Sequence, residues 1–163
     1  MTQTEKPKDI KLIIGLGNPG MKYENTYHNV GVLFIDSLKD KKDRKILRSS
    51  VYMNESGAFV KNELKKHKVK PSELLIVHDE SDIELGKVKL SFDRGAAGHN
   101  GVQDIIDKLK TKAFWRLRLG IRPISPLGKE RPKADKFVLK PISATNKTVL
   151  KKIFALEEAK LFS

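Results

Sequence analysis

The apolar positions of this chain fall into short runs of two kinds, strand-like and helix-like, that follow one another. Residues 12–16 and 74–77 are continuous apolar runs, which is typical of strands covered on both faces. Residues 86–92 and 115–121 alternate between apolar and polar positions, as half-buried strands do, and residues 46–53 predict a further short strand. Helical spacing predicts helices over about 30–39, 54–69, 101–109 and 143–161.

This succession of strands and helices predicts the fold class. We expect an α/β protein with a mixed β-sheet and helices on both of its faces. A chain of 163 residues fits one domain, which we place at residues 10–163. Residues 1–9 are expected to form a flexible N-terminal tail.

Composition restricts the compartment. The chain has no cysteine, which leaves no disulfide, no thiolate nucleophile and no cysteine-ligated zinc, and suits a reducing compartment. The first nine residues lack the apolar segment of a signal peptide, and no run approaches about 18 apolar residues. We therefore expect a cytoplasmic monomer that has no contact with a membrane.

The charge of the chain favours a polyanionic partner. Its 33 Lys and Arg outnumber 20 Asp and Glu, for a formal net charge of +13, and nucleic acid is the usual partner of such a protein. The basic residues recur in clusters at 39–45, 61–70, 87–89, 108–112 and 116–122. Such clusters can cradle a folded RNA by its phosphates; the alternative is a lysine-rich surface that serves only solubility.

Gly15, Gly17 and Gly20 have the spacing of a dinucleotide-binding loop after a strand. That loop requires a helix that starts inside the glycine run and points its N-terminus at a pyrophosphate. Residues 21–29 have no apolar period, and the first predicted helix starts only near Val30. A strand that ends in an acidic residue about 20 positions further on is also missing from the pattern. We therefore predict no nucleotide cofactor.

Polar side chains gather where predicted strands end. Asn18 and His28 follow the first strand, and Asp79 follows residues 74–77. Ligands of open α/β sheets bind beyond the carboxyl ends of the strands, so these three side chains are expected to meet. A neutral histidine beside a carboxylate is a workable general base near pH 7, and asparagine amides can donate to a developing oxyanion. The simplest chemistry is attack on an activated ester by water that His28 activates, with no metal and no organic cofactor.

Five motifs stand in the order found in bacterial-type peptidyl-tRNA hydrolases, and over about residues 10–140 the chain resembles that family. The motifs are Gly15-Leu16-Gly17-Asn18-Pro19-Gly20 with Tyr23, Thr26-x-His28-Asn29-x-Gly31, Tyr52-Met53-Asn54-x-Ser56-Gly57, His78-Asp79-Glu80-x-Asp82 and Gly98-His99-Asn100-Gly101. The resemblance implies hydrolysis of the ester that joins a peptide to the 3′ ribose of tRNA. It also implies that His28 is the base, that Asp79 orients it, and that Asn18 positions the substrate or stabilises the oxyanion. On this basis we expect Asp79→Asn to slow the reaction less than His28→Ala.

The same resemblance implies two further sets of residues. The set expected to bind or surround the substrate is Tyr23, Met53, Asn54, His99 and Asn100. The set expected to hold a tRNA phosphate is Lys89 and Arg118.

Several of these residues also have a purely structural interpretation. Asn54 and Asn100 precede predicted helices and are good N-caps, and Asp79 can cap a turn. Tyr23 and Met53 can serve core packing alone. These alternatives stay open at the level of the sequence.

The chain departs from the family in three places. Only residues 29–52 separate His28 from Met53, fewer than the family leads us to expect. We therefore predict that one edge strand pair is missing and that a basic loop over 39–45 replaces it. Ser91 stands where the family often has a basic residue, which weakens the phosphate clamp, and the last helix is short. The favoured function is that of a peptidyl-tRNA hydrolase; the alternative is an RNA-binding relative with weak or no turnover.

Overall fold

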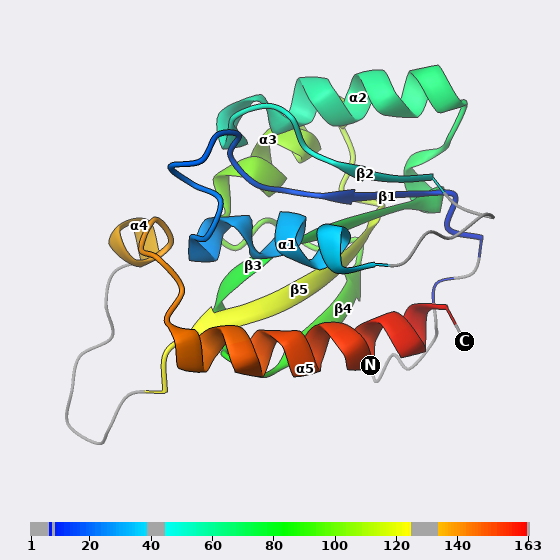
Figure 1. Cartoon of the computed structure of the whole chain (residues 1–163). Helices are drawn as coiled ribbons and strands as arrows, with labels where there is room; N and C mark the ends of the chain where they lie inside the picture. The colour runs from blue at the N-terminus through cyan, green and yellow to red at the C-terminus, as the bar shows by residue number, and fades with distance from the viewer. Residues whose placement is uncertain (1–6, 8, 39–44, 125–133, 163) are drawn as a thin grey trace.

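The chain forms a five-stranded mixed β-sheet that is covered by helices on both faces (Figure 1). The computed structural model describes residues 7, 9–38, 45–124 and 134–162. The strand order is β2-β1-β3-β5-β4, and only β4 runs antiparallel to its neighbour. The strands are β1 (Leu12–Gly15), β2 (Lys45–Arg48), β3 (Leu74–Glu84), β4 (Val88–Phe92) and β5 (Trp115–Arg122). This architecture confirms the predicted α/β class with a mixed sheet.

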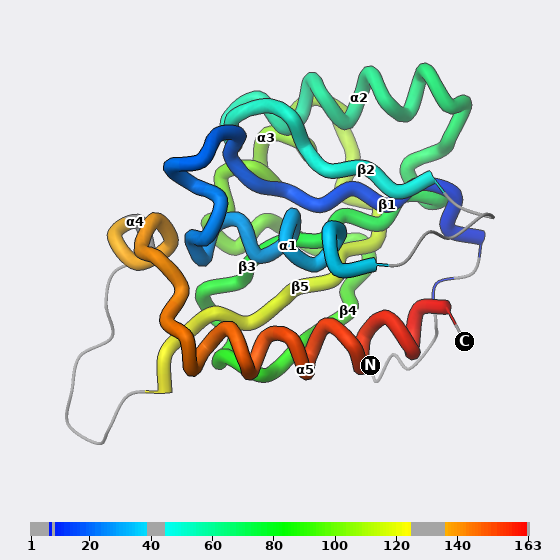
Figure 2. Tube along the Cα trace, in the orientation of Figure 1, coloured from blue at the N-terminus to red at the C-terminus, as the bar shows by residue number. Residues whose placement is uncertain are grey.

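Two pairs of helices enclose the sheet. Figure 2 shows α2 and α3 on one side of it and α5 on the other, and α1 packs into the same apolar cluster as α5. The helices are α1 (Val30–Ser37), α2 (Ser56–His67), α3 (Asn100–Leu109), α4 (Ala134–Phe137) and α5 (Ala144–Leu161), and short 3-10 turns cover Tyr27–Asn29, Met53–Glu55 and Pro71–Glu73.

Alternate strand residues supply the two apolar layers. Ile13 and Leu75 face the cluster that contains α1 and α5, whereas Ile14 and Ile76 face the cluster that contains α2 and α3. Successive side chains of a strand point to opposite faces of a sheet. The apolar runs at residues 12–16 and 74–77 are therefore buried on both faces, as their continuous apolar sequence predicted.

Three predicted boundaries were wrong. The strand expected over 46–53 ends at Arg48, because its partner β1 is only four residues long. The strand expected over 74–77 continues to Glu84, because β5 pairs with its polar second half. The helix expected to reach residue 69 stops at His67, where Lys68 adopts a left-handed conformation with a φ of 56°.

The glycines of the first loop allow close packing of the backbone. A Cβ on Gly15 would collide with the carbonyl oxygen of Gly31 at the start of α1, and a Cβ on Gly31 would collide with the carbonyl oxygen of Val77 in β3. The helix after the loop begins at Val30, well beyond Gly20. Gly15 and Gly31 thus let α1 lie directly on β1 and β3, whereas Gly20 adopts a φ of 98° and a Cβ there would meet no atom within 4 Å.

Two sequence predictions concern residues outside this description. The basic loop at 39–45 lies outside the described residues except for Lys45, and so does most of the predicted tail at 1–9. Within the described part of the chain, no helix is both long enough and apolar enough to cross a membrane.

Candidate active site

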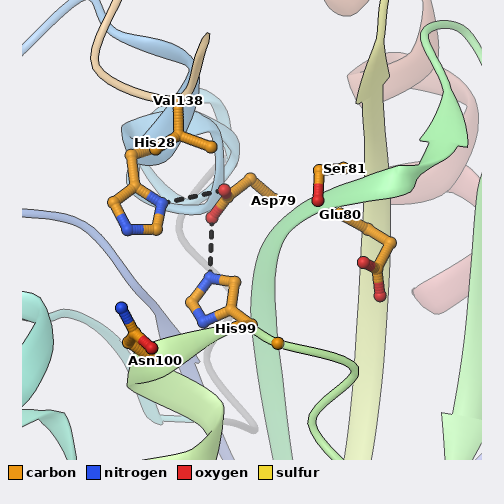
Figure 3. Close-up of a pocket in the computed structure, with 8 residues that line it drawn as sticks. His28, Asp79, Glu80, Ser81, His99, Asn100 and Val138 are labelled. Carbon is orange, nitrogen blue, oxygen red and sulfur yellow. Dashed lines mark hydrogen bonds and ion pairs between the residues drawn. The ribbon is translucent and has the colours of Figure 1, made fainter. Parts of the chain in front are cut away.

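A polar pocket opens beside the middle of β3. His28 comes from the loop after β1, Asp79 from β3, and His99 and Asn100 from the junction of a glycine loop with α3 (Figure 3). The full lining is His28, Asp79, Glu80, Ser81, Gly98, His99, Asn100 and Val138. The predicted pair of His28 and Asp79 therefore meets, although Asp79 lies within β3 and not beyond its end.

Asp79 is the centre of this pocket. Its side chain is only 2% exposed, and its two carboxylate oxygens contact two different histidines. Oδ2 accepts from Nδ1 of His28 at 2.8 Å, and Oδ1 accepts from Nε2 of His99 at 2.8 Å (Figure 3). The imidazole rings of the two histidines lie 5.1 Å apart between centroids. One buried carboxylate thus orients both rings at once.

The hydrogen bonds fix which ring nitrogens carry protons. Nδ1 of His99 accepts from the backbone N–H of Val102 at 3.2 Å, so that nitrogen has no proton and Nε2 must be the one that donates to Asp79. For His28, Nδ1 donates to Asp79, which leaves Nε2 as an acceptor on the far side of the ring. His28 can therefore take a proton from a bound molecule, whereas both ring nitrogens of His99 are already engaged.

The charges in the pocket stabilise one another. Burial alone would raise the pKa of Asp79, but His99 and His28 outweigh it and hold the pKa well below its usual range. Burial alone would lower the pKa of His28, but the charge and hydrogen bond of Asp79 outweigh it, so the pKa lies above its ordinary value of 6.5. Asp79 is thus a permanent carboxylate, and His28 is more basic than a free histidine.

The loop that carries His28 is held by the chain that leads into α5. The backbone N–H of His28 donates to the carbonyl of Val138 at 2.7 Å. The neighbouring Tyr27 ring stacks on Phe137 at 4.4 Å, and its hydroxyl accepts from Nδ2 of Asn146 at 2.8 Å. Sequence reasoning missed these residues, because backbone pairing between distant segments leaves no motif.

Asn18 does not line the pocket and bonds to neither His28 nor Asp79. Its side-chain oxygen accepts from the backbone N–H of Met53 at 2.8 Å, and its backbone exchanges two hydrogen bonds with the side chain of Asn29. The carboxamide is therefore oriented with its oxygen toward Met53 and its Nδ2 group away from it. The structure brings together His28 and Asp79, while Asn18 ties the β1 loop to the turn that begins at Met53.

The N-cap interpretation of two asparagines was wrong. The N-cap of α3 is His99, which bonds to Val102, and Asn100 is the first helical residue, with an exposed side chain at the pocket. Asn54 lies inside the turn Met53–Glu55, for which the N-cap is Tyr52. Neither asparagine caps a helix, because the extended conformation that a cap requires is taken by His99 before Asn100 and by Tyr52 two residues before Asn54.

The remaining predicted substrate residues, Met53 and Tyr23, do not line the pocket. The Met53 side chain is buried, and its sulfur packs where a Cβ on Gly101 would lie. Tyr23 contacts the half-exposed ring of Tyr52 edge-on, with 6.3 Å between centroids. Met53 therefore supports the wall of α3, and the two tyrosines form an aromatic surface near the entrance of the β1 loop.

Comparison with known proteins decides the family. A family model described as peptidyl-tRNA hydrolase matches residues 12–51 and 40–161. The peptidyl-tRNA hydrolase of Sulfurihydrogenibium is 40% identical over 90% of this chain and 86% of its own length, and that of Aquifex aeolicus is 36% identical over 89% and 84%. The crystal structure of peptidyl-tRNA hydrolase from Acinetobacter baumannii superposes with a TM-score of 0.80 at 30% identity, over 98% of this chain and 89% of that one. The chain belongs to the peptidyl-tRNA hydrolase family.

The match to the peptidyl-tRNA hydrolase model comes in two segments that overlap at residues 40–51. This is the region in which the sequence predicts a missing strand pair. Within the described residues the sheet ends on this side at β2, which has only four residues. A short edge strand exposes few unpaired backbone groups, and the loss of a strand pair relative to the family stays a prediction.

The two residues predicted to hold a tRNA phosphate lie in different surroundings. Lys89 is exposed on β4. Arg118 on β5 is buried, with its Nε 3.0 Å from a carboxylate oxygen of Glu80 and its NH1 3.2 Å from the hydroxyl of Ser91. In this member of the peptidyl-tRNA hydrolase family, the Ser91 hydroxyl therefore completes a buried ion pair.

His28, Asp79 and His99 also form the one group among the described residues whose ligand atoms could surround a metal ion, with all three atoms within 4.8 Å of one another. The hydrogen bonds of 2.8 Å from both rings to Asp79 already account for this grouping. A metal would have to displace both ring protons, so the expectation of a metal-free site stays a prediction.

Proposed function

We propose that this protein hydrolyses the ester bond of peptidyl-tRNA, with His28 as the general base that activates water. The observation that carries this assignment is the orientation of His28: Asp79 holds Nδ1, and Nε2 is left as an acceptor at the pocket. Membership of the peptidyl-tRNA hydrolase family supports the choice of substrate.

The proposed reaction proceeds in two steps. Nε2 of His28 takes a proton from water while the oxygen of that water forms a bond to the ester carbonyl carbon. The tetrahedral intermediate then breaks its bond to the ribose oxygen, and protonated His28 returns the proton to that leaving oxygen. Asp79 stabilises the imidazolium that forms between the two steps, because it is a buried carboxylate 2.8 Å from Nδ1.

Uncharged amides are suited to hold the substrate. Asn100 has an exposed side chain at the pocket, and the Nδ2 group of Asn18 points away from Met53. Both can donate to the ester carbonyl, whose oxygen becomes negative in the intermediate. We propose that Asn54, Met53 and the Tyr23 ring bind the adjoining part of the substrate, and that His99 acts only through Asp79.

The proposed tRNA surface includes β4 and β5. Lys89 is exposed and available to a phosphate, whereas Arg118 can reach one only if its ion pair with Glu80 opens. We therefore propose that Lys89 contacts tRNA directly and that Arg118 contributes chiefly by holding β5 against β4 through Ser91. The net charge of +13 favours binding along the phosphate backbone.

The test is hydrolysis of a short N-blocked aminoacyl-tRNA by the purified protein and by His28→Ala. The variant is expected to lose about 10²–10⁴-fold in rate while tRNA binding persists, since a positioned general base contributes that much. Equal rates for the two proteins would remove His28 from the mechanism. Salt-sensitive tRNA binding without release of product by the unmutated protein would favour the RNA-binding alternative.

A further inference from the structure

We propose that His78 is a positioning residue for hydrolysis, which fixes the backbone of Asp79 and the ring of His99 from behind the pocket. This inference rests on the proposed function of the pocket. His78 is fully buried in β3 and does not line the pocket. Its contacts nevertheless lead to the catalytic carboxylate by two routes.

The first route is a hydrogen bond. Nδ1 of His78 lies 2.7 Å from the backbone carbonyl oxygen of Asp79. A carbonyl oxygen can only accept a hydrogen bond, so Nδ1 carries the proton and Nε2 carries a lone pair. The side chain of His78 therefore holds the peptide unit that carries the catalytic carboxylate.

The second route is a ring contact. The rings of His78 and His99 lie 4.7 Å apart at an interplanar angle of 66°, an edge-on arrangement. His99 in turn donates to Oδ1 of Asp79. Both the backbone of Asp79 and one of its two side-chain partners are thus braced by the same buried imidazole.

Arg116 fixes the state of this imidazole. Its NH1 lies 3.5 Å from Nε2 of His78, and its NH2 donates to the carbonyl of Gly95 at 2.8 Å. Burial, together with the neighbouring charges of His99 and Arg116, holds the pKa of His78 well below its usual range. A neutral imidazole with its proton on Nδ1 is the form that can donate to the Asp79 carbonyl and also face a cation.

Arg116 is itself unusual, because it is buried and the hydrogen bonds that its guanidinium makes within the described residues go to a carbonyl and an imidazole rather than a carboxylate. Burial and the nearby charge of Arg118 lower the pKa of Arg116 to about 10, so it remains a cation at neutral pH. Its bond to Gly95 anchors the loop that leads to His99. The positions of His78 and of this loop are therefore set by one side chain of β5.

Two substitutions separate the hydrogen bond to Asp79 from the contact with Arg116, and both remove the ring that contacts His99. His78→Asn retains an N–H donor at the place of Nδ1 but loses the group that faces Arg116. His78→Gln places its amide near Nε2 and loses the donor to Asp79. We expect His78→Gln to lower kcat about five- to tenfold, the worth of one hydrogen bond, with KM within about twofold. His78→Asn should keep kcat within about twofold of the unmutated protein. His67→Gln is the matched control, because His67 lies on α2 and pairs with Glu63 there, and it should leave kcat unchanged.

The experiment measures kcat and KM on N-blocked aminoacyl-tRNA for each protein, together with thermal unfolding. A full kcat in His78→Gln would overturn the inference. Equal losses in both variants would do so too, as would loss of folding in both, since His78 would then serve the stability of β3 rather than the carboxylate. Failure of the proposed function is distinguishable, because the unmutated protein would then release no product.

Discussion

Replacing Asp79 by Asn tests the proton arrangement of the pocket. Asp79 accepts from both His28 and His99, but an asparagine has one accepting oxygen and one donating NH2 group. Nδ1 of His99 is committed to the N–H of Val102, so Nε2 of His99 must donate and will take the oxygen. The NH2 group then faces Nδ1 of His28. This moves the proton of His28 to Nε2, and the base is blocked.

The size of the rate loss in Asp79→Asn follows from the cost of the one amide orientation that would keep His28 active. If the oxygen of the new asparagine faced His28, Nδ1 of His99 would have to carry a proton and would face the N–H of Val102. Two buried donors would then meet, at a cost of about 1–3 kcal/mol for each donor left without an acceptor. The two donors together cost about 2–6 kcal/mol, and since about 1.4 kcal/mol is a factor of ten, the active arrangement falls to a minority of roughly one in thirty to about one in 10⁴.

Loss of the carboxylate charge adds to this effect. We therefore expect Asp79→Asn to slow hydrolysis by about 10²–10⁴-fold, as much as the loss of the base itself. The sequence alone suggested a smaller loss than for His28→Ala. The difference arises because His99 dictates how the new amide must point.

The decisive variant is the double substitution Asp79→Asn with His99→Asn. An asparagine at position 99 can still cap α3 by accepting from Val102, but it is too short to compete for the new amide at position 79. That amide is then free to turn its oxygen toward His28. We expect the double variant to be about tenfold or more faster than Asp79→Asn alone, although His99→Asn alone should be about fivefold slower than the unmutated protein.

The assay is single-turnover release of product from N-blocked aminoacyl-tRNA, with thermal unfolding to show that all four proteins fold. A double variant that is no faster than Asp79→Asn would refute the tautomer argument. A single variant Asp79→Asn with nearly full activity would refute the role of the carboxylate.

Three further predictions concern the base and the tRNA surface. Because the pKa of His28 is raised above 6.5 and the base must be neutral, kcat/KM should rise with pH through an inflection above that value. An inflection at lower pH would contradict the argument that Asp79 raises the pKa of His28. Lys89→Ala should weaken tRNA binding and reduce by about one the slope of log affinity against log salt concentration, whereas Lys66→Ala on α2 should change neither, as measured by filter binding at several salt concentrations. Arg118→Ala should lower the free energy of unfolding by about 3–5 kcal/mol, because it leaves Glu80 buried without its partner. Denaturant unfolding measures this change, and an unchanged free energy of unfolding would mean that Arg118 serves only to contact tRNA.

Much of the fold could be predicted from the local sequence pattern. The apolar runs at 12–16 and 74–77 predicted buried strands, and the structure has strands at Leu12–Gly15 and from Leu74 onward. The predicted helix at 30–39 corresponds to Val30–Ser37, and that at 143–161 to Ala144–Leu161. The apolar pattern sets these elements, because the two strands are buried on both faces and each helix buries one face along its length.

Polar segments were harder to predict. The second half of β3 is polar and contains Asp79 and Glu80, yet it is strand because β5 supplies its hydrogen bonds. The N-cap of α3 is His99 rather than Asn100, because the ring nitrogen of His99 has Asp79 on its other side. Propensity favours asparagine at a cap, but tertiary contacts of the histidine override it.

The sequence by itself determined the α/β class, the order of the motifs, and that His28 and Asp79 would meet. Only the tertiary structure decided that Asp79 serves two histidines, and that Arg116 and Arg118 turn inward. An arginine in an alternating strand has the same local pattern whether it meets water, phosphate or a buried carboxylate. The pairing of β3 with β5 places Glu80 and His78 beside these arginines, and a charge is buried only where such partners from other strands replace its water.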